Sequence, residues 1–328
     1  MKKYFIYTIL FAFVASISFT GCKYDDECDC SDNGAVAYNT LTAHLKSIDM
    51  DINHVLTNAN GQKFVMAAPA DGDLSAKWIL DIRSAADFGT AHIEGANNVA
   101  FSDILTAAAT ADKPIIVVCY TGQTACYATS LLRLYGYEDT QALKWGMSGW
   151  NTTFDKWTAN CKDLTTSSNW NTTINASASF SAPEWSSSTT DGASLLKERV
   201  EAAVKAGFKT ATGADVLGNT SGFYVNNYFS DAHYTGFGHV NGAVRVNPLL
   251  IDDCDNLDQS NPVVTYCYTG QTSAVVTAYL NVLGFDAKSL LFGINGMSHS
   301  NVFWTAGDGV TNHWGHDSNP KDLSTVSN

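Results

Sequence analysis

Basic residues are scarce in this chain of 328 residues. Lysine and arginine total 19 against 32 aspartate and glutamate residues, which gives a formal net charge of −13 with no basic cluster. A protein that neutralises nucleic-acid phosphates needs a basic face, so nucleic acid is not expected as a partner. Charged residues make up only 16% of the chain and aromatic residues 12%. This composition excludes a mostly disordered protein.

Long apolar runs are also missing, with one exception at the N-terminus. Residues 4–19 are uncharged and mainly apolar, a stretch shorter than the roughly 20 residues of a membrane-spanning helix. The Phe-Thr-Gly-Cys sequence that ends at Cys22 resembles the lipobox of bacterial lipoproteins, which implies that Cys22 is acylated. We therefore expect a lipoprotein signal peptide at 1–22, an acidic tether at 23–38, and a protein lipid-anchored to the membrane of the bacterial cell envelope. A plain secretory signal peptide and a retained anchor helix are the alternatives.

Cysteines are few and cannot all be paired. With Cys22 set aside, seven remain, an odd number that leaves at least one free thiol within one chain. We interpret Cys126 as a core residue and leave open whether Cys161 and Cys254 form a disulfide. The His-Trp-Gly-His sequence at 313–316 has no carboxylate or cysteine partners nearby, so no metal site is expected.

The chain contains an internal repeat. The sequence Cys-Tyr-Thr-Gly-Gln-Thr occurs at 119–124 and again at 267–272, and flanking segments recur in the same order, among them an upstream His-x-x-Gly-Ala motif. An ordered series of matches of this kind indicates a duplicated domain. We expect a first domain at 39–164, a linker rich in Ser, Thr and Asn at 165–190, and a second domain at 191–328.

Each repeat predicts alternating strands and helices. Short apolar runs at 77–80 and 114–118 are typical of buried parallel strands. Helical periodicity follows the two cysteine motifs over 125–135 and 273–283, and both segments stop at a glycine. A further helix over 197–208 opens the second domain. The pattern predicts an α/β fold in which each repeat is a mainly parallel sheet flanked by helices.

Each repeated motif places a cysteine where a strand gives way to a helix. The turn between them contains Gly122 or Gly270, which supplies backbone freedom. Backbone N–H groups of such a turn, together with the N-terminus of the helix, favour a thiolate, lower the pKa of the thiol and make it nucleophilic. Cys119 and Cys267 are therefore the candidate nucleophiles.

Both repeats resemble rhodanese domains, the fold of the sulfurtransferases. In the first repeat the resemblance rests on Asp81-Ile82-Arg83, Asp87-Phe88, the segment 92–97 and the loop 119–124, which is similar to the family's active loop C-x-x-G-x-[RT]. The second repeat departs from this pattern, with Asn226 in place of Asp81 and Tyr228 in place of Arg83. The resemblance extends to the tandem-domain thiosulfate and mercaptopyruvate sulfurtransferases, which have threonine at the last loop position.

The resemblance implies a sulfurtransferase with two tandem rhodanese-like domains. Such an enzyme moves sulfane sulfur from a small-molecule donor, such as thiosulfate or mercaptopyruvate, to a thiol or cyanide acceptor through a cysteine persulfide, without a metal or cofactor. The alternative is a non-catalytic rhodanese-fold module that binds a ligand or senses sulfur at the envelope. The loop residues expected to bind the donor are Tyr120, Thr121, Gly122, Gln123, Thr124, Tyr268, Thr269, Gly270, Gln271 and Thr272. The residues expected to support the loops structurally are Asp81, Arg83, His92 and His239.

Overall fold

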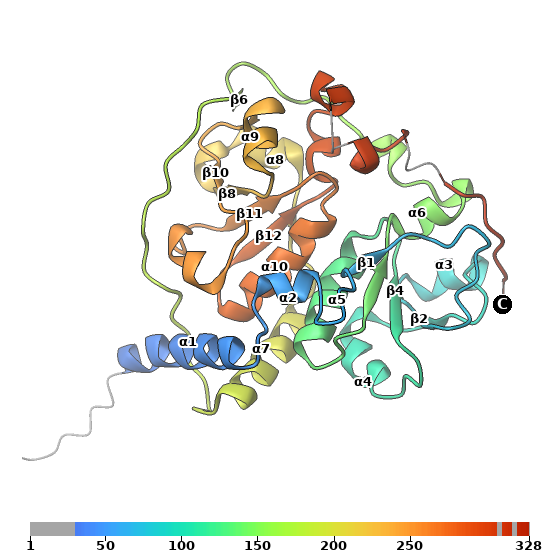
Figure 1. Ribbon diagram of the computed structural model, residues 1–328, viewed down its shortest axis with the longest axis horizontal. Coiled ribbons are helices and arrows are strands. Elements are labelled where there is room, and N and C mark those ends of the chain that lie inside the picture. The colour runs from blue at the N-terminus through green and yellow to red at the C-terminus, as the bar shows by residue number, and fades with distance from the viewer. Residues whose placement is uncertain (1–29, 307–309, 317–319, 328) are drawn as a thin grey trace, which may run out of the picture.

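The computed structural model describes residues 30–306, 310–316 and 320–327, and it contains two five-stranded sheets surrounded by helices (Figure 1). The expected signal peptide, Cys22 and the start of the expected tether lie outside the described residues. Helix α1, Cys30–Ser47, begins within the segment expected to be a tether. Within the described part of the chain, no helix is both long enough and apolar enough to cross a membrane.

The first sheet has the strand order β1-β5-β4-β2-β3, and all neighbouring strands are parallel. The strands β2 and β4 coincide with the two predicted apolar runs. Strand β4 is a continuous Ile-Ile-Val-Val run because both faces of a parallel sheet are buried. The strands are β1 Val65–Met66, β2 Trp78–Asp81, β3 Asn97–Asn98, β4 Ile115–Val118 and β5 Gln141–Leu143.

The second sheet repeats the first strand for strand. Its order, β7-β12-β11-β8-β10, places the counterparts of β1, β5, β4, β2 and β3 in the same sequence, and all pairs are again parallel. The predicted fold class is thus confirmed: each half of the chain is a parallel sheet flanked by helices. The strands are β7 Thr210–Ala211, β8 Tyr224–Asn227, β10 Val244–Arg245, β11 Val263–Tyr266 and β12 Ala287–Leu290.

The predicted helices are present and begin a few residues earlier than their apolar periodicity indicated. Helix α5, Gln123–Leu134, follows β4, and helix α10, Gln271–Leu283, follows β11. Gly136 and Gly284 end them in the left-handed conformation, with φ of 106° and 104°. The other helices are α2 Ile52–Leu56, α3 Ala85–Thr90, α4 Ile104–Ala108, α6 Gly146–Trp150, α7 Gly192–Ala206, α8 Gly213–Gly218 and α9 Asp231–Gly236.

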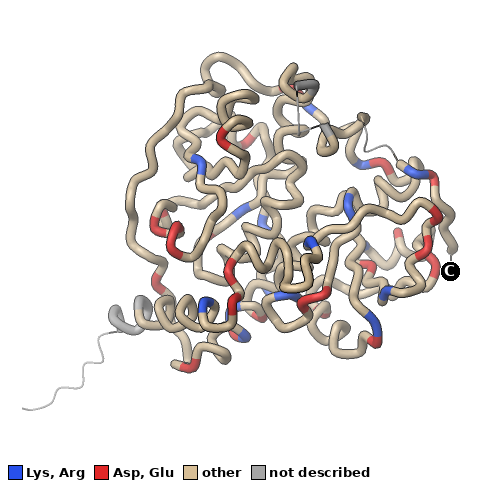
Figure 2. The backbone as a smooth tube through the Cα atoms, viewed as in Figure 1, with Lys and Arg blue, Asp and Glu red and all other residues tan. Residues whose placement is uncertain are grey.

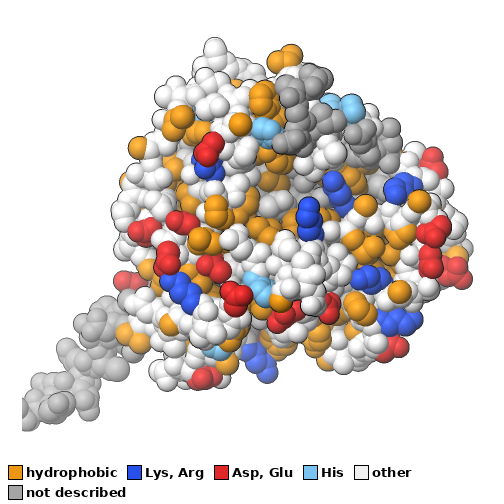
Figure 3. Space-filling view, viewed as in Figure 1, with side chains coloured by type: hydrophobic (Ala, Val, Ile, Leu, Met, Phe, Trp, Pro, Cys, Tyr) orange, Lys and Arg blue, Asp and Glu red, His pale blue; other side chains and the backbone are white. Residues whose placement is uncertain are grey.

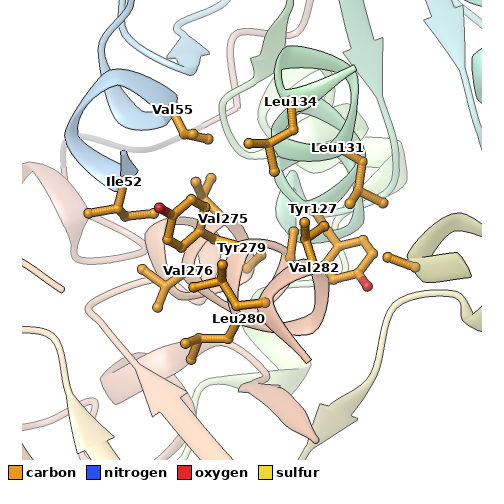
Figure 4. Close-up of a cluster of buried hydrophobic side chains, with 14 of the residues drawn as sticks. Ile52, Val55, Tyr127, Leu131, Leu134, Val275, Val276, Tyr279, Leu280 and Val282 are labelled. Atoms are coloured by element: carbon orange, nitrogen blue, oxygen red, sulfur yellow. The ribbon is translucent and has the colours of Figure 1, made fainter. Parts of the chain in front are cut away.

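The two halves share one central core, in which α5 and α10 pack against each other (Figures 1 and 4). Side chains of both helices pack together there, and Figure 4 shows Tyr127 of α5 beside Val282 of α10, with Tyr279 beside Ile52 of α2. Alternate strand residues belong to different cores, since Val117 faces this cluster while Val118 lies in a separate core on the other face of the first sheet. Burial of apolar surface at this junction holds the halves together.

Two segments connect parts of the fold that are distant in sequence. The expected linker runs along the second half (Figure 1), where β6, Trp170–Asn171, pairs antiparallel with β9, His239–Val240. Near the C-terminus, Val326 forms a β-bridge with His92 of the first half. The last described residues therefore pack on the first half rather than the second.

Charged residues are spread over the molecule without a basic face in view. Figure 2 shows Lys and Arg placed singly along the chain, and Figure 3 shows acidic side chains between them. This distribution agrees with the scarcity of basic residues in the sequence.

Candidate active site

The first cysteine loop, residues 119–124, joins β4 to α5. The Cys119 sulfur accepts hydrogen bonds from the backbone N–H groups of Gly122, at 3.2 Å, and Ala125, at 3.3 Å. Gly122 has a φ of 84°, a left-handed conformation that turns the chain into the helix. The sulfur thus lies at the carboxyl end of a buried strand and at the amino end of a helix, as the motif predicted.

Burial determines the resting charge state of this thiol. Cys119 is only 3% exposed, and burial raises the pKa of its thiol above the ordinary value, with the nearby Asp81 carboxylate acting in the same direction. Hydrogen bonds from the backbone of Ala125, Thr121 and Gly122 oppose this rise without cancelling it. The expectation that the turn alone lowers the pKa of Cys119 is therefore wrong for the closed loop, because desolvation outweighs the backbone dipoles.

The second cysteine loop, residues 267–272, joins β11 to α10 in the same manner. The Cys267 sulfur accepts a hydrogen bond from the Ser273 backbone N–H at 3.4 Å, and its thiol donates to the Ser273 hydroxyl at 3.7 Å. Cys267 is 1% exposed, and Gly270 has a φ of 75°. Both candidate nucleophiles are therefore shielded from solvent.

Each cysteine loop packs closely against a glycine that follows the next strand of its sheet. Gly146 and Gly293 both have positive φ values, of 58° and 54°. A Cβ atom on Gly146 would overlap the carbonyl oxygen of Cys119, and one on Gly293 would overlap that of Cys267. Backbone bonds then fix each loop: the N–H of Met147 donates to the Cys119 oxygen at 2.9 Å, and Ile294 repeats this bond in the second half at 3.0 Å.

Two glutamines join the loops to each other. The Gln123 side-chain oxygen accepts a hydrogen bond from the Phe292 N–H at 2.7 Å, and the Gln271 side-chain amide donates to the Thr121 carbonyl at 3.2 Å. Both glutamines are buried. A Cβ on Gly122 would collide with the Gln271 amide, and one on Gly270 with the Gln123 oxygen. Glycine is thus required at each loop both for its conformation and for the approach of the opposite loop.

An aromatic cluster covers the junction of the two loops. Trp145, Trp157 and Trp314 are buried together, and Phe292 packs against them. The Trp157 indole N–H donates to the Thr121 carbonyl at 3.3 Å, and the Trp314 indole N–H donates to the Thr158 hydroxyl at 3.0 Å. The sequence did not reveal this cover, because its members are distributed over residues 145–314.

The loop tyrosines have different partners in the two halves. In the first half the Tyr120 hydroxyl donates to the Asp87 carboxylate, and hydrogen bonds from Ser84 and Tyr120 lower the pKa of that carboxyl. In the second half the Tyr268 hydroxyl bonds to the His233 ring. Ser84 and Ser230 cap helices α3 and α9 in the same way, so Asp87 and His233 occupy equivalent positions.

A buried ion pair supports the first loop. The Arg83 guanidinium donates to both carboxylate oxygens of Asp81, with a shortest distance of 2.7 Å, and it also donates to the Ala91 carbonyl at 2.9 Å. Both side chains are buried. The Arg83 guanidinium lies 5.9 Å from the centre of the Tyr120 ring. The pair thus lies behind the loop, and among the described residues neither side chain forms a hydrogen bond with the Cys119 sulfur.

The equivalents of this pair in the second half are Asn227 and Phe229, which corrects the assignment of Asn226 and Tyr228. Asp81 pairs with Val118 one residue before its cysteine, and Asn227 pairs with Tyr266 in the same register. The Phe229 N–H donates to the Asn227 side chain at 2.9 Å, as the Arg83 N–H does to Asp81 at 3.0 Å. Phe229 also stacks on Tyr268, with ring centres 4.5 Å apart.

The remaining predicted residues lie near the loops without touching the sulfurs. His92 stacks on Phe88 and bonds to its carbonyl at 2.8 Å, and His239 stacks on Tyr234 in the second half. Both histidines therefore shape the chain after α3 and α9. Thr124 and Thr272 lie half-buried in the first helical turns, and among the described residues neither hydroxyl bonds to a cysteine sulfur. Thr269 accepts a hydrogen bond from the Gln271 N–H within its own loop, at 3.3 Å.

Cys126, Cys161 and Cys254 are free thiols. Cys161 and Cys254 are not bridged, which settles the open question of their pairing. Cys126 is completely buried in the central core, and burial raises the pKa of its thiol well above the ordinary value. Within the described residues no group of three or more His, Cys, Asp or Glu side chains is placed to hold a metal ion.

Comparison with known proteins identifies the family. The rhodanese-like domain matches residues 65–153. The thiosulfate sulfurtransferase GlpE of Pseudomonas fluorescens is 35% identical over 79 residues, covering 23% of this chain and 72% of that protein. GlpE of Shewanella oneidensis is 35% identical over 75 residues, covering 22% and 74%. The chain therefore belongs to the rhodanese-like domain family.

The match to the rhodanese-like domain lies in the first half, at residues 65–153. A crystal structure of a thiosulfate sulfurtransferase from Pseudomonas aeruginosa covers 81% of this chain and 46% of its own, but at 17% identity and a TM-score of 0.29. The family assignment rests on the sequence matches and not on this superposition. The second half is related to the first by its strand order and by the repeated loop.

Proposed function

We propose that this protein is a rhodanese-type sulfurtransferase that carries sulfane sulfur as a persulfide on Cys119, Cys267 or both. The observation that carries the proposal is the position of the Cys119 sulfur at the end of β4, with two backbone N–H groups directed at it. This loop lies within residues 65–153, which match the rhodanese-like domain, and the chain is similar to proteins named thiosulfate sulfurtransferase. The donors that fit the proposal are thiosulfate and mercaptopyruvate, and the acceptors are thiols or cyanide.

The proposed reaction has two steps. The cysteine thiolate attacks the outer sulfur of thiosulfate, the S–S bond of the donor breaks, and sulfite leaves with the bonding pair. A thiolate or cyanide then attacks the outer sulfur of the persulfide, and the cysteine leaves as the regenerated thiolate. The backbone N–H groups of Gly122 and Ala125 stabilise the negative charge on sulfur in both forms. The scheme requires no metal and no cofactor.

The closed loops place a condition on this scheme. Because both sulfurs are shielded and the loops are joined by Gln123 and Gln271, a donor reaches either cysteine only after the loops separate. Separation also admits water, which reduces the desolvation that raises the pKa of Cys119. Opening and activation of the thiol are therefore the same event in the proposal.

The proposal includes the second half and the envelope. We treat the second half as a second rhodanese-like domain because it has the strand order and the loop sequence of the first. We place the protein at the bacterial cell envelope, held by a lipid on Cys22, because the sequence before that residue has the form of a lipoprotein signal. Small sulfur compounds, rather than nucleic acid, are the proposed partners.

A second candidate function is a non-catalytic module that binds a ligand or senses sulfur. The observation that favours it is the closure of both sites, with Cys119 3% and Cys267 1% exposed beneath a tryptophan cluster. A protein that only senses sulfur species needs a single modification of a thiol, not repeated opening. The two functions differ in turnover.

Mass spectrometry tests the proposal directly. The full-length chain, purified in mild detergent, is incubated with thiosulfate, mercaptopyruvate or polysulfide, and its intact mass is measured. We expect the mass of one added sulfur atom per working cysteine, lost in Cys119→Ser or Cys267→Ser, and removed from the wild type by cyanide with release of thiocyanate. Cys161→Ser, a half-buried thiol outside both loops, is the matched control and retains the adduct.

The outcomes separate the candidate functions. An adduct that cyanide removes over many cycles supports the enzyme. An adduct that forms once and is not passed to cyanide or thiols supports the sensing module. If no donor adds sulfur to either cysteine while both remain reduced, the persulfide proposal is wrong.

A further inference from the structure

Two buried hydroxyl groups lie behind the sulfur of Cys267. The thiol donates to the Ser273 hydroxyl at 3.7 Å, and the Ser273 and Ser289 hydroxyl oxygens are 2.9 Å apart. Ser289 in turn donates to the Gly270 carbonyl at 3.4 Å. Ser273 and Ser289 are both fully buried. A continuous chain of hydrogen bonds therefore runs from the sulfur to the backbone of its own loop.

The first half has the same backbone without these hydroxyls. Ala125 stands six residues after Cys119, where Ser273 stands after Cys267. Ala142 pairs with Val117, and Ser289 pairs with the equivalent Thr265, so Ala142 and Ser289 also correspond. Both alanines are completely buried. The duplicated sites therefore differ by two hydroxyl groups at matched positions.

A count of hydrogens shows that the chain can reverse. A serine hydroxyl carries one hydrogen and accepts others through its oxygen. With a neutral thiol, Cys267 donates to Ser273, Ser273 to Ser289, and Ser289 to the Gly270 carbonyl. With a thiolate, Ser289 donates to Ser273 and Ser273 donates to the sulfur. The Gly270 carbonyl then keeps the Ala274 N–H, at 3.2 Å, as its donor.

Reversal therefore leaves no buried polar group without a partner. It requires only rotation of the two hydroxyl groups. Each hydroxyl has a single hydrogen, and rotation moves that hydrogen from one acceptor to the next. A hydrogen bond to the charged form of a group favours that form, and a charge-assisted bond is stronger than a neutral one. Among the residues that the structure describes, the sulfur of Cys119 has only backbone donors, so it lacks an equivalent of this response.

We propose that Ser273 and Ser289 are positioning residues that stabilise the Cys267 thiolate by reversing this hydroxyl chain, which makes Cys267 the more readily ionised of the two loop thiols. The bearing of this inference on sulfur transfer rests on the proposed function, whereas ionisation of the thiol does not depend on it. If the two loop thiols ionise to different extents, the two sites differ in the fraction of thiolate available to attack a sulfur donor.

The charged and titratable surroundings of the two thiols agree with this difference. The Asp81 carboxylate lies near Cys119, and its equivalent in the second half is the neutral Asn227. The titratable groups near Cys267 include Cys126 on α5 and Tyr228 after β8, and burial raises the pKa of each of these two groups. Both are therefore neutral at neutral pH and place no negative charge beside the Cys267 sulfur.

The test is a pH profile of thiol reactivity in the full-length protein. The rate of alkylation by iodoacetamide is measured for Cys119 and Cys267 separately, by mass spectrometry of the peptides that contain them. The plateau rate reports access, and the midpoint reports the ionisation of the thiol. We expect Cys267 to titrate below Cys119. Ser273→Ala is expected to raise the Cys267 midpoint by about one pH unit, and Ser289→Ala by less, since one hydroxyl still reaches the sulfur.

Two further variants make the result specific. Thr277→Val removes another buried hydroxyl one turn further along α10, one that has no hydrogen-bond partner among the described residues, and is expected to leave the midpoint unchanged. Ala125→Ser with Ala142→Ser transplants the pair to the first half and is expected to lower the Cys119 midpoint by a similar amount.

The outcomes decide the inference independently of sulfur transfer. A midpoint for Cys267 that does not move in Ser273→Ala overturns it, as does an equal shift in Thr277→Val. If Ser273→Ala does not fold, the double variant Ala125→Ser with Ala142→Ser decides the question. An unchanged Cys119 midpoint in that variant also overturns the inference. Failure of sulfur loading with an intact midpoint shift contradicts the proposed function and leaves the hydroxyl chain established.

Discussion

The two cysteine loops have the same backbone and different surroundings. Both have a left-handed glycine before the helix, a second glycine beneath the cysteine carbonyl, and a glutamine that reaches the other loop. Around this common frame, the buried ion pair of the first half is replaced by an asparagine and a phenylalanine, and two alanines are replaced by serines. Geometry was thus retained after duplication while the charge near each sulfur diverged.

This comparison assigns different roles to backbone and side chains. The glycines admit no side chain because another backbone or amide occupies the space, so they are fixed by sterics. The groups behind each sulfur are limited only by the need to leave no unpaired buried charge or polar group. The first half meets the charge condition with an ion pair, although Nη1 of Arg83 has no hydrogen-bond partner, and the second half meets it with neutral side chains.

Disrupting the ion pair of the first half is expected to have the largest effect. Within the described part of the chain, Asp81→Ala leaves the buried Arg83 guanidinium with the Ala91 carbonyl as its only hydrogen-bond acceptor, and removal of one member of a buried pair costs about 3–5 kcal/mol. Replacing both residues with those of the second half, as Asp81→Asn with Arg83→Phe, leaves no buried charge and recovers most of the loss. Urea unfolding followed by tryptophan fluorescence measures both.

The matched control lies in the second half. Asn227→Ala removes two neutral hydrogen bonds, one to the Tyr266 hydroxyl and one from the Phe229 N–H, and is expected to cost only about 1–2 kcal/mol. If Asp81→Ala and Asn227→Ala destabilise the protein equally, the two halves are not supported differently and the comparison fails at this point.

Gly122 tests the requirement for close approach of the loops. Gly136→Ala adds a methyl group at a positive φ with no atom within 4 Å, so only the backbone penalty of about 1–2 kcal/mol applies. Gly122→Ala incurs the same backbone penalty, displaces the Gln271 amide and also crowds the backbone nitrogen of Trp145. We expect a loss nearer 3 kcal/mol together with faster alkylation of Cys119 and Cys267. Equal losses for the two variants would show that the loops are not in contact in solution.

Much of the fold follows from local patterns in the sequence. The Ile-Ile-Val-Val run of β4 and the helical periodicity after each cysteine depend on neighbouring residues, and both elements are present at the predicted positions. The two cysteines also lie at their predicted strand ends. These features could be read because apolar periodicity and glycine placement act within a few residues.

The rest of the site depends on contacts between distant residues. Gln123 meets Phe292, and Trp157 meets Trp314, pairs whose approach follows from the packing of α5 on α10 and not from any local pattern. The assignment of Asn226 and Tyr228 was wrong because the offset between the repeats is 146 residues from Ser84 to Ser230 and 148 from Cys119 to Cys267. The serine caps of α3 and α9 mark the correct register.

The two glutamines are expected to stabilise the closed arrangement of the loops to different extents. Gln123→Ala leaves the Phe292 N–H without its partner, whereas after Gln271→Ala the Thr121 carbonyl still accepts from Trp157. Gln123→Ala is expected to weaken closure of the loops by about 1–2 kcal/mol and Gln271→Ala by about 0.5–1 kcal/mol. The alkylation rate of both loop cysteines should therefore rise roughly tenfold in the first variant and roughly threefold in the second. Gln259→Ala, which changes a half-buried glutamine outside both loops, is the control. A rise confined to one cysteine would mean that the loops open independently.

The smallest expected effect concerns the tyrosine partners at the two loops. Hydrogen bonds from Ser84 and Tyr120 lower the pKa of Asp87 below its ordinary value of 3.8. A carboxyl with a lowered folded-state pKa contributes stability above its unfolded pKa, and that contribution is lost as the pH falls through the folded pKa. The unfolding midpoint of the wild type should therefore exceed that of Asp87→Asn slightly at neutral pH, and the difference should disappear as the pH falls below 3.8. Because His233 holds the equivalent position, His233→Asn should show no such loss in this acid range, and a parallel loss there would contradict the divergence of the two loops.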